Sequence, residues 1–227
     1  MSPHLERAMY VHSAFRIGHD QAFRLLRERT FGSLVVADQA GKPSAVHLPF
    51  LAHRTPEGGF RVELHVARAN GLHRLVSPGG QPALLTCQGP DAYVSPDWYG
   101  VPGQVPTWTY ASVHLGGTLS ILPEEDGPAH LDRLTEEFES RLLPKRPWTA
   151  GKLDAQRRAA MTRAIVALEL VVSPEGVEAQ NKLVQHKGLA EHQGAIAGLR
   201  ARGDPGSVAI AAMMADTLAA RNDRSRS

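Results

Sequence analysis

Alternating apolar and polar positions run through much of the first half of the chain. Successive side chains of a β-strand point to opposite faces, so a period of two predicts a strand with one buried face. The clearest case is 60–67, FRVELHVA, where four apolar residues alternate with arginine, glutamate and histidine. Similar β-rich segments lie at 33–37, 44–52, 83–89, 107–122 and 164–172, between turns rich in glycine, proline and aspartate.

A helical period appears in three other places. Residues 19–30 predict a capped amphipathic helix before the first strand. Leu131, Leu134, Phe138 and Leu142 recur at helical spacing, and a further helix begins near Asp154. The carboxyl end predicts two alanine-rich helices on either side of GDPGS at 203–207, followed by a frayed tail at 221–227.

This order of elements predicts a mainly β chain of the α+β class, an antiparallel barrel with peripheral helices. We expect one domain, with residues 1–175 forming the barrel, including inserted helices at about 125–163. Residues 176–227 are expected to add a segment near the cofactor and the last helices. Prolines and glycines between Pro90 and Pro106 predict a long loop, and a long loop in a compact domain is usually functional.

Composition narrows the class of protein. The 227 residues are 42% hydrophobic, which suits a globular core, and 25 Lys plus Arg against 23 Asp plus Glu give a formal net charge of +2. Such a balance does not predict a nucleic-acid partner. The single cysteine, Cys87, excludes an internal disulfide or a CxxC zinc motif, and no apolar run reaches about 18 residues. We therefore expect a cytoplasmic protein without a membrane span.

Three histidines fall opposite the apolar positions of their strands: His47, His65 and His114. Each of these positions can simply face water. Trp108 and Tyr110 occupy the same kind of face as His114, which favours a partly covered cleft that suits a flat aromatic ligand.

Heme and flavin are the two planar cofactors that such a cleft could hold. A neutral imidazole is a good iron ligand, whereas a flavin needs cationic or amide groups for its phosphate, for which Arg68, Asn70, Arg74 and Lys182 are candidates. The chain lacks GxGxxG, GxxxxGK[ST], HExxH and GxSxG motifs, which disfavours Rossmann, P-loop, zincin and hydrolase chemistry. Cys87 lies in an apolar strand segment, where an inert buried thiol is expected.

Several strings identify a resemblance to a known family. They are MYVHSAFRI at 9–17, FGSLV at 31–35, HLPF at 47–50, HVARAN at 65–70, QGPDAYVSPDWY at 88–99, VPTWTYASVH at 105–114 and AIVALEL at 164–170. By these strings the chain is similar to the PaiB-like proteins, described as FMN-binding negative transcriptional regulators, and the resemblance spans about four-fifths of it. The resemblance implies a split β-barrel like that of flavin-binding oxidases, assembled as a homodimer with the cofactor between subunits.

One segment departs from the family pattern. Members commonly carry a KLSQN-like string after the last barrel strand, whereas this chain has KLVQHK at 182–187. This difference favours the branch that resembles heme-dependent piperazate synthases, which cyclise the amino acid N5-hydroxyornithine by forming an N–N bond with loss of water. An FMN-binding PaiB-type regulator and a flavin oxidoreductase remain the alternatives.

For the heme enzyme we expect heme b, or FMN in the alternative, with iron bound by His65 and with His47 as second choice. The general acid and base are expected among Tyr93, Tyr110, Lys182 and His114, which the residues alone do not rank. The expected cofactor-binding residues are His47, Arg68, Asn70, Trp108, His114 and Gln185.

Overall fold

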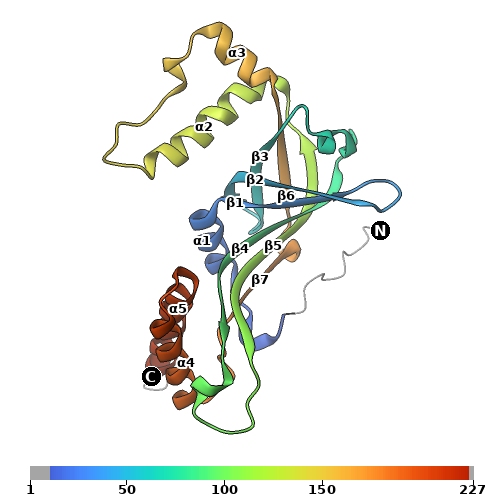
Figure 1. Cartoon of the computed structure of the whole chain (residues 1–227). Coiled ribbons are helices and arrows are strands. Elements are labelled where there is room, and N and C mark those ends of the chain that lie inside the picture. Colours follow the sequence, from blue (N-terminus) through green and yellow to red (C-terminus); the bar gives the residue numbers. More distant parts are fainter. Residues whose placement is uncertain (1–10, 225–227) are drawn as a thin grey trace. The chain divides into compact units, whose positions relative to one another are not determined.

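A seven-stranded antiparallel sheet forms the centre of the computed structural model, which describes residues 11–224 (Figure 1). The strand order is β4-β1-β2-β3-β6-β5-β7, and β4 also pairs with β5, which closes the sheet into a barrel. The predicted barrel with peripheral helices is thus confirmed. The strands are β1 (Phe31–Ala37), β2 (Pro43–Arg54), β3 (Phe60–Ala67), β4 (Gln81–Val94), β5 (Thr107–Ile121), β6 (Ile165–Val172) and β7 (Val177–Lys182).

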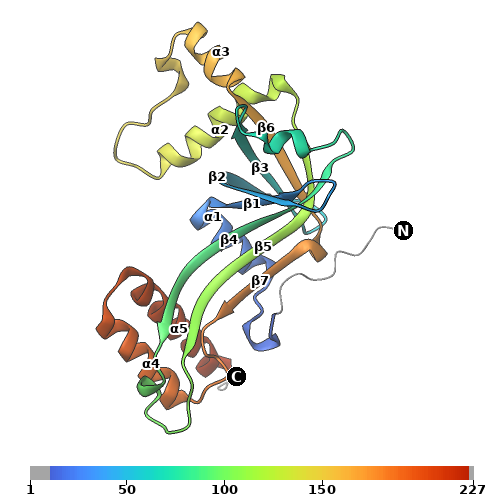
Figure 2. The ribbon, with the colours of Figure 1, turned by 45° about the vertical axis from the view of Figure 1, so that its right-hand side comes forward.

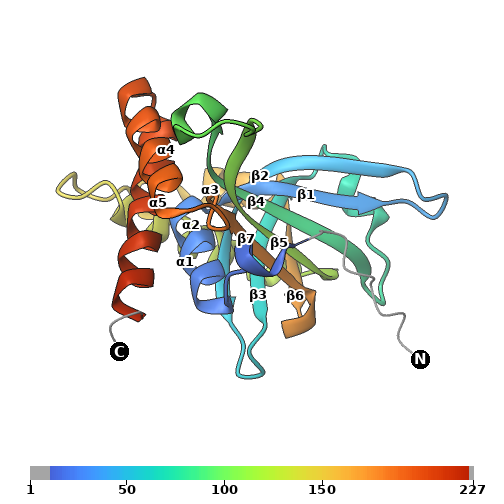
Figure 3. The same cartoon turned by 90° about the horizontal axis from the view of Figure 1, so that it is seen from below.

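Alternation explains the register of the first strands. Phe60, Val62, Leu64 and Val66 of β3 are all buried, as the sequence pattern predicts. β1 and β2 run side by side to a tight turn, with Ser33 opposite His47 (Figure 3). A one-residue slip would turn each strand's apolar set away from the core, so the buried face fixes the pairing.

Two strands differ from the prediction. β4 does not end before Pro90 but continues to Val94, so the expected loop beginning at Pro90 was wrong at its start. Burial shifts phase there: Gly89 is buried, the next two residues are half-buried, and Ala92 is buried again. Such a shift is typical of a bulge, where proline is tolerated. β7 was not predicted, because VEAQNK has little apolar alternation.

The helices are α1 (His19–Arg29), α2 (Gly127–Ser140), α3 (Ala155–Arg163), α4 (Leu189–Arg202) and α5 (Pro205–Arg224). Short 3-10 turns lie in several of the connections between elements, among them η3 (Pro96–Tyr99) between β4 and β5. α4 ends at Gly203, whose φ of 74° is a left-handed conformation that favours glycine. The two predicted C-terminal helices are confirmed, and α5 extends through most of the tail that we expected to fray.

The chain forms two compact units. Unit 1 contains 26–87 and 114–177, with α2 and α3 joined by a long loop (Figure 1). Unit 2 contains 88–113 and 178–227 together with 8–25, and α4 contacts both α5 and η3 within it (Figure 2). The prediction of one domain that divides near residue 175 stays a prediction.

Each unit has its own apolar core. That of unit 1 includes fully buried Phe50, Phe60 and Leu168. In unit 2, α4 and α5 bury Leu199, Ile210 and Met214 together with Tyr99. Part of the matching string at 9–17 and the end of the predicted tail, 225–227, lie outside the described residues. No described helix is long and apolar enough to cross a membrane.

Candidate functional site

Three aromatic side chains lie on the ends of β4 and β5 that belong to unit 2. We call Tyr93, Trp108 and Tyr110 the aromatic stripe. Trp108 is 51% exposed and Tyr93 is 37% exposed, although large aromatic side chains usually avoid water. The rings of Tyr93 and Trp108 lie 6.1 Å apart at 59°. An exposed surface of this kind indicates a place where a flat ligand can stack.

Polar neighbours fix the orientation of two of these rings. The indole Nε1 of Trp108 donates to Asp91 Oδ1 at 3.1 Å, and Asp91 also accepts from Gln88 at 2.9 Å. The buried Gln180 of β7 donates its amide to the Tyr110 hydroxyl oxygen at 3.0 Å. Because that oxygen accepts from Gln180, the phenol hydrogen can be donated to a bound molecule.

Lys182, the last residue of β7, supplies the positive charge of this region. Its Nζ lies 5.9 Å from the centre of the Tyr110 ring, in cation–π range. Within residues 11–224 no carboxylate forms an ion pair with Lys182, so its charge can meet an anionic ligand group. The predicted residues Tyr93, Trp108, Tyr110 and Lys182 therefore all fall in unit 2.

The three predicted histidines all fall in unit 1, each on the side of its strand opposite the core residues. His47 is exposed and hydrogen-bonds through Nδ1 to Ser33 Oγ at 2.7 Å. His114 is half-buried between the buried Val113 and Leu115 of β5. His65 is half-buried as well, and helix α2 reaches its face of the sheet.

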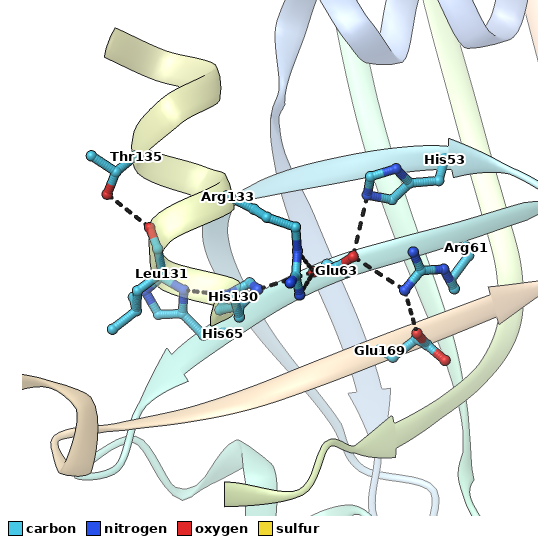
Figure 4. Close-up of polar contacts among 9 residues, drawn as sticks. All are labelled: His53, Arg61, Glu63, His65, His130, Leu131, Arg133, Thr135 and Glu169. Atoms are coloured by element: carbon cyan, nitrogen blue, oxygen red, sulfur yellow. Dashed lines mark hydrogen bonds and ion pairs between the residues drawn. The ribbon is translucent and has the colours of Figure 1, made fainter. Parts of the chain in front are cut away.

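A charged cluster occupies that covered face, centred on Glu63 of β3 (Figure 4). Glu63 is only 1% exposed, and Arg133 of α2 donates to its Oε2 atom at 3.0 and 2.6 Å. Arg61 and His53 lie 3.1 and 3.3 Å from Oε1, and Arg61 also donates to Glu169. Burial opposes ionisation of Glu63, but the hydrogen bond and charge of Arg133, aided by Arg61, outweigh it and lower the pKa.

His65 joins this cluster through a second histidine. Its Nδ1 lies 3.0 Å from Nε2 of His130, and Nδ1 of His130 lies 3.5 Å from Glu63 Oε2 (Figure 4). Burial lowers the pKa of His65. His130 is completely buried, and that burial, together with the neighbouring His65, lowers its pKa to about 4. Both rings are therefore neutral at physiological pH, with Nδ1 of His65 directed at His130.

Other predicted cofactor residues hold the chain itself together. Arg68 donates to the carbonyls of Arg163 and Ile165 and pairs with Glu124 at 2.9 Å. Asn70 accepts from the backbone of Leu72 at 3.0 Å and caps the 3-10 turn at 71–75. In unit 2, Gln185 accepts from the backbone of Leu183 at 2.7 Å. Each of these contacts uses donors or acceptors that a cofactor would need.

The single cysteine of the chain is buried and inert, as the sequence predicts. Cys87 is 1% exposed, and burial raises its pKa to about 11. No group of three or more His, Cys, Asp or Glu side chains within residues 11–224 is arranged to hold a bare metal ion.

Sequence reasoning missed Glu63 and His130. Glu63 belongs to the polar face that the alternation of 60–67 assigns to solvent or a cleft, and only the packing of α2 reveals its burial. His130 carried a usable signal, since it precedes Leu134 and Phe138 at a spacing of four on the apolar face of the predicted helix.

Comparisons with known proteins place the chain in a family. Residues 9–174 match the family model described as "Putative FMN-binding domain". The chain is 28% identical over 211 residues to the Protease synthase and sporulation protein PAI 2 of Bacillus subtilis, across 92% of this chain and 98% of that relative.

Solved structures share the fold. A FAD and heme binding protein of Mycobacterium smegmatis aligns with a TM-score of 0.52 at 18% identity, over 75% of this chain and 74% of that one. The conserved hypothetical protein Rv2991 of Mycobacterium tuberculosis aligns with a TM-score of 0.52 at 11% identity, over 77% and 91% of the two chains. The barrel, the matching family model and the nearly full-length relative together show that this chain belongs to the PaiB-like family of FMN-binding split-barrel domains.

Proposed function

We propose that this protein binds a flavin, with FMN as the first choice, and that the aromatic stripe of unit 2 contacts the flavin ring. The observation that carries the proposal is the exposure of Trp108 and Tyr93 on a stripe whose third ring, Tyr110, lies 5.9 Å from Lys182 Nζ, a cation without an ion pair within residues 11–224. Family membership supports it independently.

The residues of the stripe fit the chemistry of FMN. Trp108 and Tyr93 offer flat apolar surface, and the Tyr110 hydroxyl can donate to a ring carbonyl while Gln180 holds its oxygen. Lys182 can neutralise a phosphate. A bound flavin supplies hydride or single-electron transfer, which would make the protein an oxidoreductase acting on a small molecule.

Titration of the purified chain with FMN, followed by flavin fluorescence, tests this proposal. We expect saturable binding that weakens at least about tenfold in Lys182→Ala, the loss of one charge-assisted contact, and that Lys182→Arg largely restores. Trp108→Ala should weaken binding more than Trp108→Phe, which keeps a stacking surface. Absence of FMN binding, or equal affinity in all four variants, would overturn the proposal.

A heme-dependent enzyme that cyclises N5-hydroxyornithine to piperazic acid is the second candidate. The observation favouring it is His65, whose Nδ1 is held by His130 while Nε2 makes no hydrogen bond to a described residue. In this function His65 would hold heme b through Nε2. A bound heme would supply Lewis-acid polarisation of the N–O bond.

Absorption spectra after addition of hemin separate the two candidates. The heme enzyme predicts a Soret band that is lost in His65→Ala, and conversion of N5-hydroxyornithine to a product lighter by one water. An unchanged spectrum of free hemin, together with FMN binding, would eliminate the heme enzyme.

A PaiB-type negative transcriptional regulator is the remaining alternative. The α4–α5 pair is the helical element that could meet DNA, yet Arg202 already pairs with Asp204 at 2.7 Å, so we do not expect nucleic acid as a partner. A gel shift with DNA upstream of the gene, competed with unrelated DNA of equal length, tests this alternative.

A further inference from the structure

His65 ends a line of polar groups that begins at a buried carboxylate. Glu63 and His65 are two residues apart on β3, so both point to the face that α2 covers. His130 and Arg133 are three residues apart on α2, which places them on one side of the helix. The four side chains therefore meet between strand and helix (Figure 4).

The direction of the hydrogen bonds follows from the carboxylate. Glu63 receives two hydrogen bonds from the Arg133 guanidinium, so its Oε2 atom is an acceptor only. His130 Nδ1 lies 3.5 Å from the same oxygen, too far and too poorly aligned for a formed hydrogen bond, but this carboxylate oxygen is the acceptor that it faces, and we therefore place the hydrogen of His130 on Nδ1. His130 Nε2 is then left with a lone pair.

The contact between the two histidines then determines which ring nitrogen of His65 carries the hydrogen. A hydrogen bond of 3.0 Å between two imidazole nitrogens needs one donor and one acceptor. Because His130 Nε2 is the acceptor, His65 Nδ1 must donate. The hydrogen of His65 is thus on Nδ1, and its Nε2 carries a lone pair.

We propose that Glu63 and His130 are positioning residues that hold His65 in its Nδ1–H tautomer and present its Nε2 as an electron-pair donor to a bound molecule. The inference does not depend on which cofactor the protein takes. Through Nε2, His65 can accept a hydrogen bond from a bound molecule, act as a base or bind a metal, but it cannot donate a hydrogen bond to that molecule.

Nitrogen-15 NMR of the histidine rings in the cofactor-free protein at neutral pH tests this assignment. An unprotonated ring nitrogen resonates well downfield of an N–H nitrogen, so the spectrum identifies the tautomer directly. We expect His65 to show an N–H at Nδ1 and an unprotonated Nε2. A hydrogen on Nε2 of His65 in the wild-type protein would overturn the proposal, whatever the variants do.

Two variants with the same substitution separate positioning from packing. His130→Phe removes the acceptor but keeps a ring in the buried position, and should shift His65 toward the Nε2–H tautomer that free histidine favours. His53→Phe is the matched control, because His53 contacts the other oxygen of Glu63, at 3.3 Å, and should leave His65 unchanged. An unchanged His65 tautomer in folded His130→Phe would refute a positioning role for His130.

Discussion

His65 Nδ1 and His130 Nε2 lie 3.0 Å apart, and this contact links a barrel strand to the helix that covers it. It means that α2 docks on the outer face of β3 through polar groups as well as apolar ones. Glu63, beneath the helix, has nearly no exposure, so the docking depends on keeping that carboxylate paired.

Arg133→Met should destabilise the protein by about 1.5–3 kcal/mol, the range for a hydrogen bond to a buried charged group. The methionine keeps the apolar stem, while Glu63 loses two hydrogen bonds at 3.0 and 2.6 Å. Urea unfolding measures the change. Arg158→Met is the control, because its partner Asp132 is half exposed and such pairs contribute about 0–1 kcal/mol. Equal losses in both variants would contradict a special role for Glu63.

Gly194→Ala should destabilise unit 2 by about 1–3 kcal/mol, even though alanine is the better helix former. An added Cβ would lie 2.0 Å from the backbone oxygen of Trp98, so α4 would have to move away from η3. Thermal unfolding measures the effect. Gly71→Ala, where no atom lies within 4 Å, should be nearly neutral. A stabilised Gly194→Ala would show that helix propensity outweighs this close approach.

His192 should make the protein less stable as the pH falls below 6.5. It is fully buried in unit 2, and burial, aided by the charge of Arg221, lowers its pKa from 6.5. Below pH 6.5 the unfolded chain binds a proton on this side chain that the folded chain does not bind. The stability contributed by the neutral, buried His192 is therefore full above pH 6.5 and is lost as the pH falls toward the lowered pKa of the folded state. The loss is up to about 1.4 kcal/mol per pH unit.

His192→Leu removes the imidazole that takes up this proton in the unfolded chain. Urea unfolding at about pH 7.5 and about pH 5.5 should show a smaller loss of stability in the variant than in the wild-type protein. If both proteins lose the same free energy of unfolding between the two pH values, other groups cause the pH dependence and His192 does not contribute.

We propose that the protein is a homodimer, and the outer face of β1 and β2 offers the apolar surface for it. Phe31 is 56% exposed there, and half-buried Val35 and exposed Ala45 lie opposite each other four residues further along the same strand pair. Phe31→Glu should shift the mass in light scattering from dimer toward monomer. Val105→Glu, at a residue that is 70% exposed, should not. A monomeric wild-type protein at micromolar concentration would contradict the proposal.

The pattern of apolar residues was enough to predict most of the helices and strands. Period-two alternation placed most of the strands, and apolar spacing placed α2 and the C-terminal helices, because burial of one face leaves a periodic record in the chain. The sequence also determined the family and the inert state of Cys87. β7 was not predicted, because VEAQNK does not alternate between apolar and polar residues.

The surroundings of each polar residue, in contrast, depend on contacts between segments that are far apart in the chain. Alternation placed His65 and Glu63 on one face but could not show that α2 covers it, since the partner residues, His130 and Arg133, lie more than 60 positions away. The same holds for Arg68 and Asn70, whose donors and acceptors are used by the chain itself. Periodicity reports which face a side chain occupies, whereas long-range packing decides what meets it there.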